Sequence, residues 1–272
     1  MTASDEKTAL FRNMQLTAIP AIDKAVTTLV VCQNEITDIS PVKEHKQLTY
    51  LDLAQNLISD ISILKYLQNV TVLNLRQNKL KDISPLKNLP NVQKLKLGFN
   101  QLDNIQVLAF LTKLTYLELD GNAITDCSSL VSLPLTWLDI SSNKLTQIQR
   151  FSNTLQVLFL QRNKIANIDV LNNLINLVTL NISINEITNI DCLKACTKLQ
   201  TCWLDRNKIV TCPNLAEILP NVTDLWTKFG NSNQNPFVKA ENYPKIVNYI
   251  AMVSFDGENN PSFNDQADVT EW

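Results

Sequence analysis

Asparagine recurs along most of this chain at a nearly constant interval, and this periodicity restricts the fold more than any other feature of the sequence. Successive members are 22, 22, 22, 22, 21, 20, 22 and 22 residues apart: Asn34, Asn56, Asn78, Asn100, Asn122, Asn143, Asn163, Asn185 and Asn207. Each closes a block of the form LxxLxLxxN, such as residues 48–56 (LTYLDLAQN) and 114–122 (LTYLELDGN). A fixed period of this length predicts a solenoid in which each repeat stacks on its neighbours.

The residues inside one repeat predict its local structure. Apolar and polar residues alternate within the block, which is typical of a half-buried strand. Apolar residues then return at intervals of three, which suits short helical turns, and the segments 36–40 (ITDIS) and 80–84 (LKDIS) are each followed by proline, which favours helix entry. The asparagine amide can bond backbone groups of two neighbouring repeats and so form a ladder. The predicted fold class is α/β, a leucine-rich repeat solenoid with a curved parallel sheet on the concave face and helical turns on the convex face.

The same pattern divides the chain into four parts. Residues 1–25 are predicted to be an N-terminal cap and partial repeat, and residues 26–219 to be nine repeats. Residues 220–256 are predicted to hold a degenerate tenth strand at 222–230 and a C-terminal cap with a helix at about 239–251. Residues 257–272 form an acidic tail.

Composition argues against several classes of function. The 24 basic and 26 acidic residues give a net charge of −2, which does not favour nucleic-acid binding. Four glycines in 272 residues are too few for a phosphate-binding loop, and the only histidine is His45. We expect no cofactor and no metal, and Cys127, Cys196, Cys202 and Cys212 fall on buried slots of the repeat. The sequence shows neither a signal peptide nor a membrane span, so we expect a cytoplasmic or nuclear protein with no membrane partner.

The outward positions of the strands are the candidate binding surface. In each block the third, fifth and seventh places should project from the concave face, and aromatic and charged side chains gather there. Three of the four tryptophans lie in these places. Exposed aromatic residues surrounded by charge are typical of protein–protein hot spots. The candidate partner-binding residues are Asp52, Arg76, Lys94, Lys96, Tyr116, Glu118, Asp120, Trp137, Asp139, Phe159, Trp203, Asp205, Asp224 and Trp226.

The C-terminal segment carries a resemblance to known proteins. Asn235-Pro236, Tyr243, an amphipathic stretch and a Phe-Asp pair at 255–256 resemble the cap motif of three groups of leucine-rich repeat proteins. These groups are the SDS-twenty-two-like regulators of type-1 protein phosphatase, the dynein axonemal light chains and the spliceosomal U2 A-prime proteins. Repeat length and the aromatic fifth place of residues 199–207 favour the first group. The resemblance covers roughly residues 26–256.

This resemblance implies a regulatory subunit that binds the catalytic subunit of type-1 protein phosphatase. In that family the concave fifth places alternate between acids and aromatics that contact the phosphatase. Asp52, Trp203 and Trp226 match this pattern and Phe159 fits it in character, whereas Asn74, Lys96 and Asn181 depart from it.

Two other functions stay open. One is an adaptor for the cytoskeleton, as in the dynein light chains. The other is an internalin-like bacterial adhesin or effector, because ITDISPV and LKDISPL resemble the 22-residue repeats of internalins. All three are non-enzymatic scaffolds for a folded protein partner. Asp120 and Asp139 could form a carboxylate pair, but an open sheet offers no water-excluding pocket for acid catalysis. We therefore predict no catalytic residues.

Overall fold

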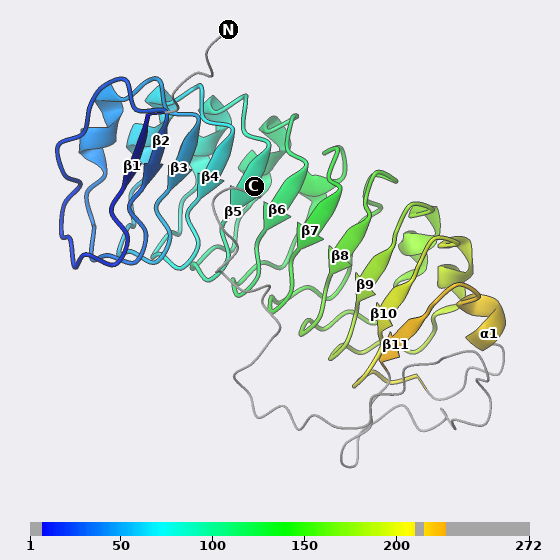
Figure 1. Cartoon of the computed structure of the whole chain (residues 1–272). Helices are drawn as coiled ribbons and strands as arrows, with labels where there is room; N and C mark the ends of the chain where they lie inside the picture. The colour runs from blue at the N-terminus through cyan, green and yellow to red at the C-terminus, as the bar shows by residue number, and fades with distance from the viewer. Residues whose placement is uncertain (1–6, 210–214, 227–272) are drawn as a thin grey trace, which may run out of the picture.

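One sheet runs from the first to the last strand of the described residues. The computed structural model describes residues 7–209 and 215–226. Within them, eleven parallel strands pair in chain order from β1 to β11, which confirms the predicted parallel solenoid (Figure 1). At about 4.8 Å per strand the sheet is about 48 Å long. The strands are β1 (Thr8–Leu10), β2 (Thr28–Val30), β3 (Tyr50–Asp52), β4 (Val72–Asn74), β5 (Lys94–Lys96), β6 (Tyr116–Glu118), β7 (Trp137–Asp139), β8 (Val157–Phe159), β9 (Thr179–Asn181), β10 (Thr201–Trp203) and β11 (Asp224–Trp226).

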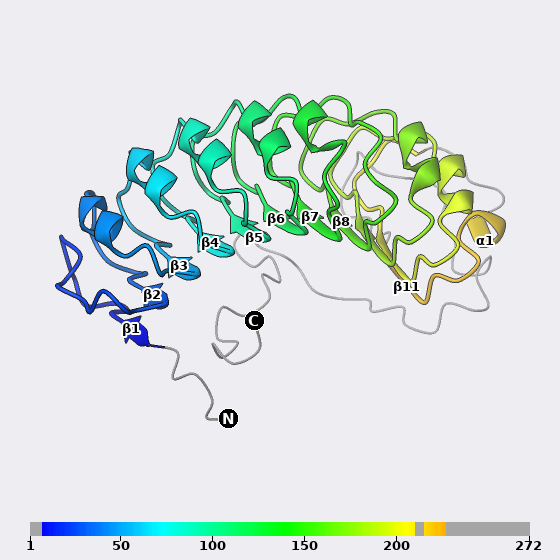
Figure 2. The same ribbon diagram turned by 90° about the horizontal axis from the view of Figure 1, so that it is seen from above.

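Within the described residues, short helical turns lie on the opposite side of the sheet and follow every strand from β2 to β10 except β7. Figure 2 shows the strands on the inner side of an arc and the helical turns on its outer side. The turns are η1 (Ser40–Glu44), η2 (Ser62–Tyr66), η3 (Ser84–Asn88), η4 (Gln106–Phe110), η5 (Ser128–Leu130), η6 (Asp169–Asn173) and η7 (Asp191–Ala195), all of the 3-10 type, and the α-helix α1 (Leu215–Ile218). Proline occupies the first turn of η1 and η3, as the sequence predicted. A helical turn with its side chains is wider than the spacing of about 4.8 Å between neighbouring strands, so the outer side of the repeats takes more room and the sheet lies on the concave side.

The asparagine ladder holds successive repeats together. The Asn56 Oδ1 accepts the Ile36 N–H at 3.0 Å, and its Nδ2 donates to the Val31 carbonyl of the preceding repeat at 3.0 Å and to the Leu53 carbonyl at 3.1 Å. The other ladder asparagines repeat this pattern. The residue before each of the nine asparagines has a positive φ, so the chain turns sharply off the strand at this point. The ladder satisfies the backbone groups that this turn leaves unpaired.

One continuous core lies between the sheet and the helical turns. It extends from Ile19 to Val222 and consists mainly of leucine and isoleucine from the repeat slots. Cys127, Cys196 and Cys202 are buried in it, and His45 is buried near its N-terminal end. Burial raises the pKa of the Cys127 and Cys196 thiols to about 11, so they are neutral and apolar in character.

The N-terminal part differs from the expectation of ten strands, because β1 adds an eleventh. Its residues pair in register with β2, and the Met14 and Leu16 N–H groups both donate to the Asn34 Oδ1 at 3.0 Å. The predicted tenth strand is present as β11. The predicted cap helix, the acidic tail and Cys212 lie outside the described residues. None of the described helices has the length and apolar character needed to cross a membrane.

Candidate functional site

The repeat aligns outward-facing side chains into columns on the concave face. Each strand from β2 to β10 buries its middle residue, such as Leu117 in β6 and Leu138 in β7, and turns its first and third residues toward the concave face. The parallel register then places equivalent residues side by side, with Tyr116 opposite Trp137 and Glu118 opposite Asp139. The predicted candidate residues therefore lie on one surface, in three adjacent columns.

Five aromatic rings form a chain of contacts across this surface, which we call the aromatic stripe: Tyr116, Trp137, Phe159, Trp203 and Trp226. Tyr116 and Trp137 stack with ring centroids 4.2 Å apart and an interplanar angle of 11°. Trp137 meets Phe159 edge to face at 5.6 Å, and Phe159 reaches Trp203 at 6.4 Å. Trp203 and Trp226 are near-parallel at 6.5 Å. The stripe therefore extends from β6 to β11.

The aromatic stripe does not belong to the leucine core. Its two tryptophans at the C-terminal end differ from core residues in their exposure, since Trp226 is 37% exposed and Trp203 is half-buried. Mutual stacking stabilises such rings by about 0.5–1.5 kcal/mol per pair, but it leaves their edges and outer faces open to a partner. The stripe thus combines rigidity with exposed apolar area.

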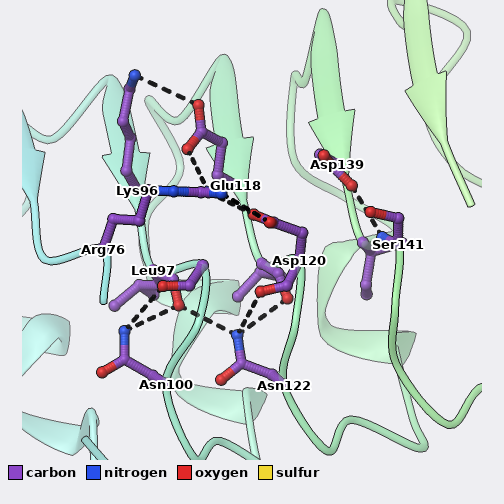
Figure 3. A network of polar contacts seen from close by, with 12 residues as sticks. Arg76, Lys96, Leu97, Asn100, Glu118, Asp120, Asn122, Asp139 and Ser141 are labelled. Carbon is purple, nitrogen blue, oxygen red and sulfur yellow. Dashed lines mark hydrogen bonds and ion pairs between the residues drawn. The ribbon is translucent and has the colours of Figure 1, made fainter. Parts of the chain in front are cut away.

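A charged cluster lies at the N-terminal end of the stripe and consists of Arg76, Lys96, Glu118, Asp120 and Asp139 (Figure 3). The Arg76 guanidinium donates to both Asp120 carboxylate oxygens, at 2.7 and 3.0 Å, and to Glu118 at 3.2 Å. The Lys96 ammonium lies 3.3 Å from the other Glu118 oxygen. Arg76 and Lys96 are therefore paired with Glu118 and Asp120, and the basic and acidic side chains do not form two separate charged zones.

Aromatic residues hold the cations of the charged cluster in place. The Arg76 guanidinium lies 4.7 Å from the centre of the Phe99 ring, and the Lys96 ammonium lies 5.8 Å from the centre of the Tyr116 ring. The Tyr116 hydroxyl donates to Glu118 at 2.6 Å, which connects the charged cluster to the aromatic stripe. Phe99 stands directly before the ladder residue Asn100 and is not among the binding residues predicted from the sequence.

Asp139 differs from Glu118 and Asp120 because it is not paired with a cation of the charged cluster. Burial, followed by the nearby Asp120 and Glu118 carboxylates, raises its pKa to about 7, although the Ser141 N–H donates to it at 2.8 Å. Asp139 makes no ion pair with Arg76 or Lys96 in the structure. The protonated form of Asp139 is therefore favoured over the charged form relative to an ordinary aspartate.

Four fifth-place residues share a structural role that sequence reasoning missed. Asp52, Asn74, Asp139 and Asn181 each accept the backbone N–H two residues further on, at 2.8–3.1 Å. Asp52 is only 8% exposed, and burial raises its pKa. The preference of Asp and Asn for bonding the backbone two residues ahead was the available signal.

The remaining candidates lie beside the charged cluster and at the C-terminal end of the aromatic stripe. Lys94 is in β5 beside Tyr116, and Asp205 and Asp224 flank the Trp203 and Trp226 pair. No group of three or more histidine, cysteine or acidic side chains suited to a metal ion occurs among the residues that the structure describes. What the arrangement offers chemically is an open surface of aromatic rings and fixed charges.

The repeats, the asparagine ladder and the curved sheet define a leucine-rich repeat protein. Family models agree: a model described as leucine rich repeat matches residues 24–80, and a model of two leucine-rich repeat copies matches residues 68–110. A search of curated proteins found no match.

Several solved structures from Listeria monocytogenes are similar to this chain. An internalin, InlF, is 27% identical with a TM-score of 0.74, and the match covers 81% of this chain and 68% of that one. The functional domain of InlJ, described as including a cysteine ladder, is 27% identical with a TM-score of 0.69, covering 80% of this chain and 48% of that one. Internalin C2 is 28% identical with a TM-score of 0.58, covering 75% of this chain and 82% of that one. This chain therefore spans about half of the InlJ domain.

Proposed function

We propose that this protein is a non-enzymatic scaffold whose concave face binds a folded protein partner through the aromatic stripe. The observation that carries the proposal is the unbroken series of ring contacts from Tyr116 to Trp226 on the open side of the sheet. Exposed tryptophan is costly for a protein without a partner, and tryptophan, tyrosine and arginine are the residues most enriched in hot spots.

Two more specific assignments of the function are supported by different observations. The similarity to internalins in fold and repeat length supports an internalin-like binding protein. The match of Asp52, Trp203 and Trp226 to the phosphatase-regulator pattern supports type-1 protein phosphatase, and with it a cytoplasmic or nuclear location. Asp52 is bonded to its own backbone and nearly buried, so only the two tryptophans of this set offer a large contact surface.

A direct titration distinguishes these two assignments. Purified catalytic subunit of type-1 protein phosphatase is titrated into the wild-type chain and into the double variant Trp203→Ala/Trp226→Ala. Saturable binding that the double variant loses supports the phosphatase assignment. Absence of binding to the wild-type chain contradicts it, and affinity capture of other partners by the same two proteins then tests the wider proposal.

A further inference from the structure

The C-terminal end of the aromatic stripe carries two acidic residues in a specific arrangement. Trp203 and Trp226 pair in register on β10 and β11, with ring centroids 6.5 Å apart and planes inclined by 20°. Asp224 begins β11, two residues before Trp226, and Asp205 follows Trp203 by two residues. One carboxylate therefore lies on each side of the tryptophan pair along the strand direction.

The acids in this part of the concave face differ from those of the charged cluster. Glu118 and Asp120 are paired with Lys96 and Arg76. Neither Asp205 nor Asp224 makes an ion pair within the described ranges. Arg206 is exposed and acts on Asp205 only as a nearby charge, and burial raises the pKa of Asp205 in spite of it.

The outward residues of β7–β11 that the structure describes also carry more negative than positive charge. The third, fifth and seventh places there hold Asp139, Asp205 and Asp224 and, within the described ranges, no lysine or arginine; Lys228, the seventh place of the last block, lies outside those ranges. A partner that brings a cation to this surface gains both a carboxylate contact and a contact with an aromatic face. Arginine suits the site better than lysine, because its planar guanidinium can stack on tryptophan while it donates to a carboxylate.

We propose that the surface formed by Trp203, Asp205, Asp224 and Trp226 binds an arginine-containing, apolar segment of the protein partner. This inference rests on the proposed function and specifies the chemistry of the partner. The aromatic stripe crosses five strand spacings, about 24 Å, which corresponds to about seven residues in an extended segment or about sixteen in a helix. The cation lies at the β10–β11 end, and apolar side chains cover the rings toward β6.

Selection of peptides from a random library tests this proposal without knowledge of the natural partner. Phage-displayed random 16-residue peptides are selected on the immobilised full chain and on the variant Asp205→Asn/Asp224→Asn. We expect arginine to be enriched at least threefold over the starting library on the wild-type chain, and not on the variant. The matched control is Glu44→Gln/Glu217→Gln, which neutralises two exposed carboxylates of the convex side and should keep the enrichment.

Three results overturn the proposal: no peptide is selected, the selected peptides show no arginine enrichment, or the enrichment persists in the Asp205→Asn/Asp224→Asn variant. If the selected peptides lack arginine but bind Trp203→Ala more weakly than the wild-type chain, the partner segment is not cationic, although the proposed surface still binds it. If binding is the same on Trp203→Ala/Trp226→Ala, the proposed function itself fails. Thermal unfolding of each variant verifies folding, and the single variant Asp224→Asn replaces the double variant if the latter does not fold.

Discussion

The Arg76 guanidinium crosses a whole strand to reach Asp120, and it can do so because Gly98 stands between them. Arg76, Gly98 and Asp120 occupy the same column in three successive repeats, and the bidentate contact joins residues 44 positions apart. A β-carbon at position 98 would collide with the Asp120 Oδ1 and the Arg76 Nη1. Glycine is used here to let an ion pair pass rather than to allow an unusual φ.

We therefore expect Gly98→Ala to destabilise the protein by about 1–3 kcal/mol, measured by chemical unfolding, because a partly buried ion pair loses its geometry. The control is the same change in an Arg76→Ala background. There one of the two colliding groups is gone and the guanidinium no longer holds the Asp120 carboxylate in place, so Gly98→Ala should cost less by at least about 1 kcal/mol. Equal costs in the two backgrounds would show that the ion pair is not the reason for the glycine.

Asp139→Asn tests the electrostatics of the charged cluster. The folded-state pKa of Asp139 is raised, so its contribution to stability is fully present below about 3.8 and is lost as the pH rises through about 7. Asparagine should keep the bond from the Ser141 N–H, as Asn74 and Asn181 do in the same place. We expect the variant to be more stable than the wild type by roughly 1–3 kcal/mol at pH 8, with a smaller difference at pH 4. Unfolding free energies across this pH range provide the measurement, and a difference that does not depend on pH would contradict the assignment.

Asn78→Ala tests the asparagine ladder. The Asn78 side chain accepts the Ile58 N–H and donates to the Leu53 and Leu75 carbonyls, all inside the protein. Its removal leaves the buried Ile58 N–H without its partner and takes one of two asparagine bonds from each carbonyl, which Asn56 and Asn100 still bond, so we expect a loss of about 3 kcal/mol in unfolding free energy. Asn69→Ala is the control, because Asn69 is exposed and makes a single bond to the Lys46 carbonyl. It should cost less than about 1 kcal/mol.

The turn before each ladder asparagine gives a prediction of opposite sign. Ile184 has a φ of 54°, a conformation that a β-branched residue rarely adopts, whereas Gly121 occupies the equivalent turn with a φ of 66°. We expect Ile184→Asn to raise stability by about 0.5–1 kcal/mol, because asparagine tolerates this region. Gly121→Ala should lower stability, since it combines this φ with a contact of 2.9 Å to the Phe99 ring. Melting temperatures of the two variants give the signs directly.

Most of the fold could be predicted from the sequence because the apolar residues and the asparagine recur at the same positions in each repeat. The strands at 28–30 through 201–203 follow from the position of each asparagine, and the strand at 224–226 follows from the degenerate block at 222–230. The strand β1 could not be predicted in this way. Ala9 and Phe11 fill its inward slots, Met14 stands where asparagine would, and the segment leading to β2 is too short to show the repeat.

The candidate surface was predictable as a set of columns but not as a set of contacts. The strand period predicts that Arg76 and Asp120 face the same way, but their ion pair depends on the missing side chain of Gly98, which lies in an intervening repeat. The paired state of the charged cluster and the backbone bonds of Asp52 and Asn74 likewise depend on rotamers that no periodicity encodes. The sequence therefore indicates where the surface is, and the structure shows that the most exposed ring of the aromatic stripe, Trp226, lies in β11.

One paired measurement tests most directly whether the aromatic stripe binds a partner, as we propose, or is part of the core. Dissociation constants for a partner captured by the wild-type chain are measured beside the melting temperatures of Trp203→Ala and Trp226→Ala. The controls are Tyr66→Ala, an exposed aromatic residue of the convex side, and Leu204→Ala, a buried neighbour that should cost about 2–5 kcal/mol of stability. We predict that each tryptophan variant binds at least about 30-fold more weakly, equivalent to about 2 kcal/mol, while its melting temperature stays close to that of the wild type. Tryptophan variants that unfold readily yet bind with unchanged affinity per folded molecule would contradict the account.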